Sequence, residues 1–386
     1  MKKKLGLYLL VLVLAMSLLA GCSKSKDTGG TSDADVIKIG VFEPMTGAQA
    51  AGGEMTVEGI KLANEIKGEV LGKKVELVIV DNKSDKVEAA NAVSRLIEKD
   101  KVAAIIGSYS SSLAMSAGDI VKQKEVPAVG CSPTNPLVTL NNDYYFRVCF
   151  IDPFQGTVMA NYAFKDLGAK KAAIIQDVNQ DYSVGLSKYF MDAFRELTGD
   201  EDSIVEISSY NSGDQDFTAQ LTNAKGKNPD VIFAPGNYGE CALMIRQARD
   251  LGITTPILGG DTWESPEFLS IGGEAVEGAV FSTHFTAEAP VTNVSGIFLE
   301  EYKNKFNKDA NAFAALGYDA YMVILDAIER AGSADSKAIR NELAKTENFV
   351  GATGNITLDE NGDAVKSAVI NQVDGGTFKY LTTVEP

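Results

Sequence analysis

The chain has 386 residues, of which 45% are hydrophobic and 23% are charged, and this composition excludes disorder along the whole length. Its 52 acidic and 36 basic residues give a net charge of −16, which argues against nucleic acid and other polyanions as partners. The length predicts two or three domain-sized units.

The N-terminal segment, residues 1–35, is predicted to lie outside the fold. Three lysines precede an apolar run at 5–19, which is the pattern of a signal peptide and is short for a membrane span. The sequence Leu-Leu-Ala-Gly-Cys, which ends at Cys22, resembles the bacterial lipobox. The resemblance implies that residues 1–21 are removed and that Cys22 carries lipid; a plain signal peptide and a single-span anchor are the alternatives. Residues 22–35 lack apolar periodicity and are predicted to form a flexible tether.

Strand-like and helix-like patterns alternate from residue 36 onward. The expected elements of the first half are strands at 36–42, 75–81, 102–107 and 126–131, with helices at 53–67, at 87–97 and after 111. Those of the second half are strands at 171–177, 203–210, 230–236 and 255–261, with helices at 185–197, 217–225 and 240–251. Near-continuous apolar strands are typical of parallel sheets that are buried on both faces. The pattern predicts an α/β protein with two doubly wound parallel-sheet lobes.

Three crossings are expected to join the lobes. Extended segments at 143–153, 279–285 and 354–363 would carry the chain across, and a long helix at 311–331 would return to the first lobe. A final hairpin would lie on the second lobe. The N-terminal lobe is thus predicted to comprise 36–148 and 285–355, and the C-terminal lobe 149–284 and 356–386.

The cysteines and the single histidine limit the chemistry that can be expected. Beyond Cys22, the chain has Cys131, Cys149 and Cys241, which predict either one disulfide with a free thiol or three buried unpaired thiols. His284 lies in a strand-like crossing, where a hinge or surface role is expected. No G-x-S-x-G motif and no set of metal ligands is found, so neither enzymatic activity nor a cofactor or metal is expected.

Polar residues follow five predicted strands at their carboxyl ends, where open α/β sheets bind ligands. They are Ser110, Ser111 and Ser112; Ser132 and Thr134; Asp181 and Tyr182; Asn237 and Tyr238; and Asp261, Thr262 and Trp263. Hydroxyls at a helix N-terminus favour an anion, and a carboxylate opposite them favours a cation. The set predicts a site for a zwitterion, such as an α-amino acid.

Each of these residues also has a structural interpretation. Ser110 or Ser111 is expected to cap the following helix in either case. Asp261 is equally well interpreted as a cap of the segment before Pro266, and Tyr182 and Tyr238 as surface aromatics. Trp263 is left open as a pocket wall, a rim contact or a partner surface.

Several stretches resemble one known family. They include "IKIGVFEPMTGAQAAGGEMTVEGIKLANEI", "VAAIIGSYSSS", "VPAVGCSPTNPLVT", "DYSVGL" and "IRQARDLGITTPILGGDTW". They are similar to the type I periplasmic-binding-protein fold and, more narrowly, to the leucine/isoleucine/valine-binding receptors of ABC transporters. The resemblance covers essentially 36–385.

The resemblance implies roles for individual residues. The family's carboxylate-binding serine falls on Ser111, beside Ser110, while Ser132 would offer its carbonyl to the ammonium group and Thr134 would contact both groups. The other implied ligand contacts are Tyr182, Asp261 and Phe313. A further contact falls on Asn237 or, if the loop shifts by one residue, on Tyr238. The sequence departs from the family at two places. Ala51, Gly52 and Gly53 replace an aromatic and are expected to leave room for a bulkier ligand side chain. Glu43 adds a carboxylate, which would suit a polar or cationic ligand side chain.

The family resemblance implies an extracytoplasmic, lipid-anchored receptor that passes an amino acid, branched-chain or otherwise apolar, to ABC permease subunits. A monomer that touches the membrane through its lipid and binds no nucleic acid is expected. The alternatives are an amide, urea-like or aromatic-acid ligand, a sensory lipoprotein that signals to a membrane kinase or chemoreceptor, and a hydrolase that uses Ser111.

Overall fold

The computed structural model describes residues 36–386. The predicted signal peptide, the tether and the lipid site at Cys22 lie outside the described residues. Within the described range, the strands form two large sheets and one two-stranded hairpin, β12 (Phe349–Gly351) with β13 (Gly354–Ile356).

The first sheet has the strand order β2-β3-β1-β4-β5-β6. Its strands are β1 (Val36–Glu43), β2 (Glu69–Val70), β3 (Lys73–Asp81), β4 (Ala104–Ile106), β5 (Ala128–Gly130) and β6 (Tyr145–Arg147). The pairs β1–β4, β4–β5 and β5–β6 are parallel, whereas β2 and β3 form an antiparallel hairpin. The helices in sequence with this sheet are α2 (Ala50–Ile66), α3 (Lys86–Arg95) and α4 (Ser111–Lys124).

The second sheet has the strand order β15-β14-β11-β10-β9-β7-β8. Its strands are β7 (Ala172–Asp177), β8 (Ile204–Tyr210), β9 (Val231–Phe233), β10 (Ile257–Gly259), β11 (Val280–Thr283), β14 (Ala368–Asp374) and β15 (Thr377–Val384). The helices in sequence with it are α5 (Asp152–Asn161), α6 (Asp181–Thr198), α7 (Thr218–Gly226), α8 (Tyr238–Asp250) and α9 (Pro266–Gly272). The strands from β7 to β11 pair in parallel, and the hairpin β14–β15 adds to the edge in antiparallel orientation.

Further helices and short turns complete the described chain. The later helices are α10 (Asn293–Phe306), α11 (Ala312–Ala331) and α12 (Ser336–Leu343). The short 3-10 and π turns are η2 (Leu96–Asp100), η3 (Pro136–Val138), η4 (Tyr162–Asp166), η5 (Glu201–Ser203), η6 (Asp261–Trp263) and η7 (Gly273–Val276). Among residues 36–386, no helix is both long enough and apolar enough to span a bilayer.

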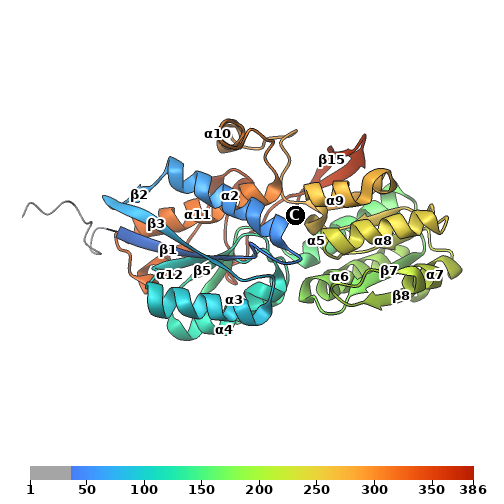
Figure 1. Cartoon of the computed structure of the whole chain (residues 1–386), viewed down its shortest axis with the longest axis horizontal. Coiled ribbons are helices and arrows are strands. Elements are labelled where there is room, and N and C mark those ends of the chain that lie inside the picture. The colour runs from blue at the N-terminus through green and yellow to red at the C-terminus, as the bar shows by residue number, and fades with distance from the viewer. Residues whose placement is uncertain (1–35) are drawn as a thin grey trace, which may run out of the picture. The chain divides into compact units, whose positions relative to one another are not determined.

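Helices cover both faces of the first sheet, as its apolar strands predict. In Figure 1, α2 and α11 lie on one side of the strands and α3 and α4 on the other. The first face contains the apolar side chains of α2 and α11 packed on β1, and the second contains those of α3 and α4. In the second lobe, α5 and α6 share one core and α7, α8 and α9 the other. The prediction of two doubly wound α/β lobes is confirmed.

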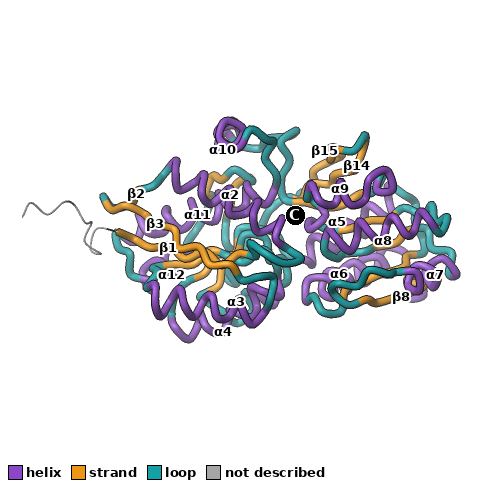
Figure 2. The backbone as a smooth tube through the Cα atoms, viewed as in Figure 1, coloured by secondary structure: helices purple, strands orange, loops and turns teal. Residues whose placement is uncertain are grey.

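The chain passes between the two sheets at the expected places. At the first crossing, β6 of the first sheet is followed by α5 of the second lobe. At the second crossing, β11 of the second sheet is followed later by α11, which packs on α2 of the first lobe. The hairpin β14–β15 then completes the second sheet. Figure 2 shows the loops that connect these strands and helices. The exact lobe boundaries given above stay a prediction.

The cysteine alternatives are resolved by the structure. Cys131, Cys149 and Cys241 are all buried and unpaired, so the alternative of three buried thiols is confirmed. Burial raises the pKa of the Cys131 thiol well above its usual value, as it does for Cys149.

Candidate functional site

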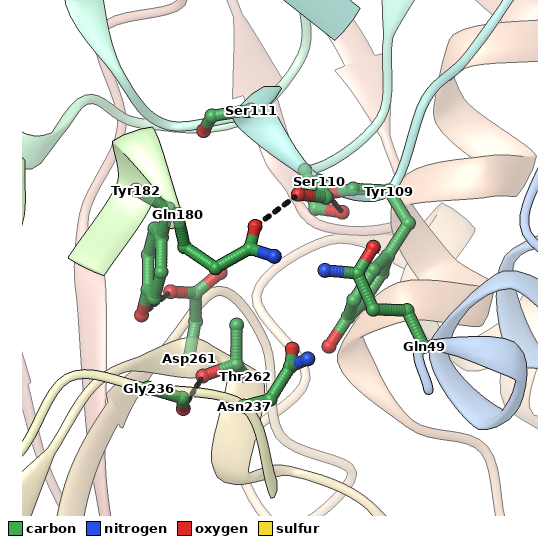
Figure 3. Close-up of a pocket in the computed structure, with 11 residues that line it drawn as sticks. Gln49, Tyr109, Ser110, Ser111, Gln180, Tyr182, Gly236, Asn237, Asp261 and Thr262 are labelled. Atoms are coloured by element: carbon green, nitrogen blue, oxygen red, sulfur yellow. Dashed lines mark hydrogen bonds between the residues drawn. The ribbon is translucent and has the colours of Figure 1, made fainter. Parts of the chain in front are cut away.

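A narrow pocket lies where the strand ends of the two lobes meet. Both lobes contribute to its lining, which consists of Gln49, Tyr109, Ser110, Ser111, Ser132, Gln180, Tyr182, Gly236, Asn237, Asp261 and Thr262. Figure 3 shows the side-chain amides of Gln49, Gln180 and Asn237 directed toward its centre. Of the predicted site residues, Ser110, Ser111, Ser132, Tyr182, Asn237 and Asp261 line the pocket, whereas Thr134, Tyr238 and Phe313 do not.

The N-terminus of α4 forms one wall. Ser110 holds the N-cap position, but its hydroxyl makes no bond to the helix and instead lies 3.5 Å from Oε1 of Gln180. The expected side-chain cap is therefore absent, and the first N–H groups of α4 lack the partner that a cap would supply. The Ser111 hydroxyl accepts a hydrogen bond from the Asn135 backbone N–H at 3.1 Å. This wall presents hydroxyls and helix N–H groups, which suit an anion.

Two residues after β5 support the same wall. Ser132 donates its hydroxyl to the Tyr109 carbonyl at 3.0 Å. Thr134 lies behind it, fully buried, with its hydroxyl near the carboxyl of Asp152 but outside hydrogen-bond geometry. Burial raises the pKa of Asp152 to about 8, against the lowering effect of the Thr134 hydroxyl.

Asp261 forms the opposite wall from η6, with 1% of the residue exposed. Its Oδ1 accepts hydrogen bonds from the Tyr182 hydroxyl at 2.8 Å and from Gln155 Nε2 at 2.9 Å. Its Oδ2 lies 3.0 Å from Nε2 of His284. The segment before Pro266, η6, has Gly260 at its N-cap position and no side-chain cap, so the interpretation of Asp261 as its cap is wrong.

The aromatic predictions divide into two groups. Tyr182 is buried against Asp261 and is no surface aromatic, and burial raises the pKa of its hydroxyl well above the usual value. Tyr238 is also buried, and its hydroxyl accepts a hydrogen bond from the Ala51 backbone N–H at 3.3 Å. Phe313 lies behind the pocket, where its ring meets that of Tyr109 edge-on at 4.8 Å. Tyr182 therefore faces the pocket, whereas Tyr238 and Phe313 support it from outside.

Tyr109 is a pocket residue that the sequence patterns did not reveal. A Cβ placed on Gly52 would lie 2.3 Å from the Tyr109 ring, so the absence of a side chain at Gly52 makes space for that ring. The expectation that the glycines leave room for a bulkier ligand is therefore wrong. Gln49 and Gln180 were missed as well, because amides in loops carry no distinctive pattern, whereas Thr262, expected after its strand, does line the pocket.

Two residues left open by the sequence lie outside the pocket. Glu43 is fully buried, and its Oε2 accepts a hydrogen bond from the Tyr109 backbone N–H at 2.6 Å. Because Glu43 braces the pocket loop from behind, it gives no support to a cationic ligand side chain. Trp263 is fully buried in the second lobe and stacks on Phe268 at 4.8 Å, so it is a core residue and none of the three options holds.

His284 is buried, with 4% of the residue exposed, and therefore has no surface role. It lies directly after β11, at the second crossing, as the hinge interpretation expected. This histidine bonds to Asp261 rather than to a serine. No group of three or more metal-binding side chains occurs among residues 36–386.

Hydrogen bonds join the two lobes around the pocket. Oδ2 of Asp181, at the start of α6, accepts from the Ser112 hydroxyl at 2.8 Å and from Lys86 Nζ at 2.9 Å. The Asp181 carbonyl accepts from Nδ2 of Asn135 at 2.8 Å. The lobes are therefore in direct contact, with the pocket enclosed between them.

Comparisons with known proteins agree with this geometry. The family described as "Periplasmic binding protein" matches residues 36–377. A curated relative, the Leu/Ile/Val-binding protein homolog 3 of Brucella melitensis, is 31% identical over 332 residues, which are 85% of this chain and 88% of the relative.

Two solved structures are similar over nearly their whole length. The leucine-binding protein LivK of Thermotoga maritima is 50% identical, with a TM-score of 0.88, covering 91% of this chain and 99% of its own. The branched-chain amino acid transporter substrate-binding protein LivJ of Streptococcus pneumoniae, solved in complex with isoleucine, is 34% identical, with a TM-score of 0.85, covering 91% of this chain and 100% of its own.

Proposed function

The chain belongs to the periplasmic binding protein family, and on that premise we propose that it is the extracytoplasmic receptor of an ABC importer for an α-amino acid. The observation that carries the proposal is the pairing of two walls in one enclosed pocket. One wall has the hydroxyls and N–H groups at the start of α4, and the other has the buried carboxylate of Asp261.

The two walls match the two charges of a zwitterion. The ligand carboxylate would lie against Ser110 and Ser111, where the helix N-terminus favours negative charge. The ammonium group would lie against Asp261, with the Ser132 carbonyl as a second acceptor. Because the walls belong to different lobes, a ligand that contacts both favours the arrangement in which the lobes touch.

The proposed side-chain class is branched-chain or otherwise apolar. It is supported by the relatives named for leucine, isoleucine and valine and by the isoleucine complex of LivJ. An aromatic acid without an ammonium group is a poorer fit, because it would leave the buried Asp261 carboxylate without a cation.

The proposed partners follow from the family. The receptor would work as a monomer, held to the membrane by lipid on Cys22, and would deliver its ligand to permease subunits without chemical change. A sensory role would use the same pocket and the same closure. Delivery to a permease is preferred because the relatives include a transporter substrate-binding protein.

A ligand panel with a pocket variant tests the proposal. We expect branched-chain amino acids to raise the melting temperature of the purified protein, because they bind only the folded state. Asp261→Ala should weaken binding of the best ligand at least about tenfold while the ligand-free protein still folds. Asp192→Ala, which removes an exposed carboxylate on α6, is the control and should bind normally. If no amino acid shifts the melting temperature, the ligand class is wrong.

A further inference from the structure

We propose that His284 is a positioning residue for the ligand's ammonium group. It holds the Asp261 carboxylate in place without neutralising it, and it connects this carboxylate to the crossings between the lobes. This inference rests on the proposed function, because it takes Asp261 as the ammonium contact. It concerns a residue that touches Asp261 and does not line the pocket.

The position of His284 links the site to two separate crossings. Its Nε2 lies 3.0 Å from Oδ2 of Asp261, and its ring stacks on Phe150 with the ring centroids 3.9 Å apart. Phe150 lies between β6 and α5 on the first crossing, whereas His284 follows β11 on the second. The imidazole therefore lies between the carboxylate and an aromatic of the other crossing.

The protonation of the imidazole follows from its partner. A carboxylate can only accept hydrogen bonds, so the N–H of a neutral His284 must be on Nε2. Its Nδ1 is buried and has no hydrogen-bond partner among the described residues. This tautomer donates one hydrogen bond to Asp261 and adds no positive charge beside it.

The other two donors to Asp261 are also uncharged. Oδ1 accepts from the Tyr182 hydroxyl and from the Gln155 amide, which also lies 2.9 Å from the Ser282 hydroxyl. Both donors are neutral, like the imidazole. Three neutral donors fix both oxygens of Asp261 but leave its negative charge to be balanced by a cation from outside. A lysine or arginine at any of these positions would compete with the ligand's ammonium group.

Burial favours the neutral form of His284 at neutral pH. Burial lowers the pKa of His284, and the nearby Lys366 lowers it further, whereas the bond to Asp261 raises it in part. Two further carboxyls lie near Asp261: that of Asp152 in α5 and that of Glu264 directly after η6. Protonation of His284 in acid would place a cation on Asp261, so acid should weaken binding through this residue.

The test compares two substitutions of His284 by titration calorimetry with the ligand that gives the largest thermal shift. His284→Phe keeps a ring against Phe150 but removes the donor, and we expect binding to weaken at least about tenfold. His284→Gln keeps an amide donor, and we expect it to stay within about threefold of the wild type. Asp192→Ala, which removes an exposed carboxylate on α6 that makes no bond to Asp261 or its donors, is the control and should bind normally.

Two further measurements separate positioning from a structural role. In an Asp261→Ala background, His284→Phe should cause no additional loss, because its effect passes through the carboxylate. As the pH falls through the pKa of His284, read from the NMR signal of this single histidine, the wild type should lose more affinity than His284→Gln, which has no imidazole to protonate. Normal binding by His284→Phe, an equal loss in both backgrounds, or equal acid losses would each overturn the inference.

The outcomes also distinguish this inference from the proposed function. If Asp261→Ala itself binds normally, the assignment of the ammonium site fails. If Asp261→Ala weakens binding but His284→Phe does not, only the positioning role fails. Should His284→Phe fail to fold, the acid comparison with His284→Gln still decides the matter.

Discussion

The Glu43 carboxyl shows that a fully buried acid can support the pocket without facing it. It holds the backbone of Tyr109 through a hydrogen bond of 2.6 Å, and Tyr109 in turn forms part of the pocket lining. Burial, as the largest cause, raises the pKa of Glu43 to about 8 from an ordinary value of 4.5. The folded protein therefore holds this proton to a higher pH than the unfolded chain.

This shift predicts a pH dependence of stability. The stabilisation that comes from the raised pKa is fully present below pH 4.5 and is lost as the pH rises through about 8. Glu43→Gln removes this titration but keeps an acceptor for Tyr109. We expect the variant to lose less free energy of unfolding than the wild type between about pH 5 and 8, and to be the more stable protein at the upper end by on the order of 1–3 kcal/mol.

Urea unfolding at several pH values measures the difference. Glu98→Gln provides the control, because Glu98 is exposed and pairs with Lys124 at the surface. Parallel pH profiles of wild type and Glu43→Gln would contradict the prediction.

Sequence reasoning identified only part of the site at the scale of single residues. Ser111 and Asp261 were predicted because each follows a recognisable strand, and strand ends converge in this class of fold. Tyr109 and His284 were not assigned to the site. The role of Tyr109 depends on the missing side chain of Gly52, and that of His284 depends on stacking against Phe150, and both are contacts between segments distant in sequence.

Among the elements, α2 and α11 are in unusually close contact. A Cβ on Gly59 of α2 would lie 1.8 Å from the Ala314 carbonyl oxygen of α11, and one on Gly317 would lie 2.3 Å from the Thr56 carbonyl. Reciprocal glycines thus let the two helix backbones approach. This contact places the start of α11, with Phe313, behind the pocket.

The helix contact predicts an asymmetry between two glycine substitutions. Gly59→Ala should destabilise the protein by about 1–3 kcal/mol or more, because the clash is with backbone that cannot repack. Gly296→Ala lies inside α10 with no atom near the added methyl group, so it should be neutral or stabilising by up to about 1 kcal/mol. Thermal unfolding of both variants measures the difference, and equal effects would show that α2 and α11 separate easily.

The elements with strong apolar patterns were predicted well, and the short or polar ones were not. Most strands and helices up to β10, the long helix α11 and the final hairpin were expected close to their observed positions, whereas β2 and α10 were not expected. Helix α5 was missed because it begins at Asp152-Pro153, inside the segment interpreted as a crossing. Helices α9 and α12 have 7 and 8 residues, which is too short for a clear helical period.

At the scale of the whole molecule, Asp181 makes several hydrogen bonds between the two lobes. Its carboxylate accepts from Ser112 and Lys86, and its carbonyl accepts from Asn135, all from the first lobe. These bonds exist only while the lobes touch. Their contribution should therefore appear in ligand affinity rather than in the stability of either lobe.

Asp181→Ala removes the two side-chain bonds and leaves the backbone bond to Asn135 in place. We expect the dissociation constant to rise about three- to tenfold, mainly through faster release, while the melting temperature of the ligand-free protein changes little. Asp192→Ala on the same helix removes an exposed carboxylate that pairs within α6 and serves as the matched control. Stopped-flow release rates decide the question, and an unchanged rate would show that these bonds add nothing to closure.

The overall topology was predictable because each crossing is visible in the sequence as a strand-like segment that is followed by an element of the other lobe. The lobe contacts were not predictable, since residues such as Asp181 and Ser112 are 69 positions apart and meet only in the assembled fold. Their side chains are ordinary surface types.

The three crossings also have a consequence for synthesis. The first sheet is covered by α11, and the second sheet receives its edge strands β14 and β15 from residues 368–384. Neither lobe can therefore complete its core while the chain is still emerging in order from the ribosome. A chain whose native contacts are this long-range folds late. The same connections that join the lobes therefore delay the completion of both cores until nearly the whole chain has been made.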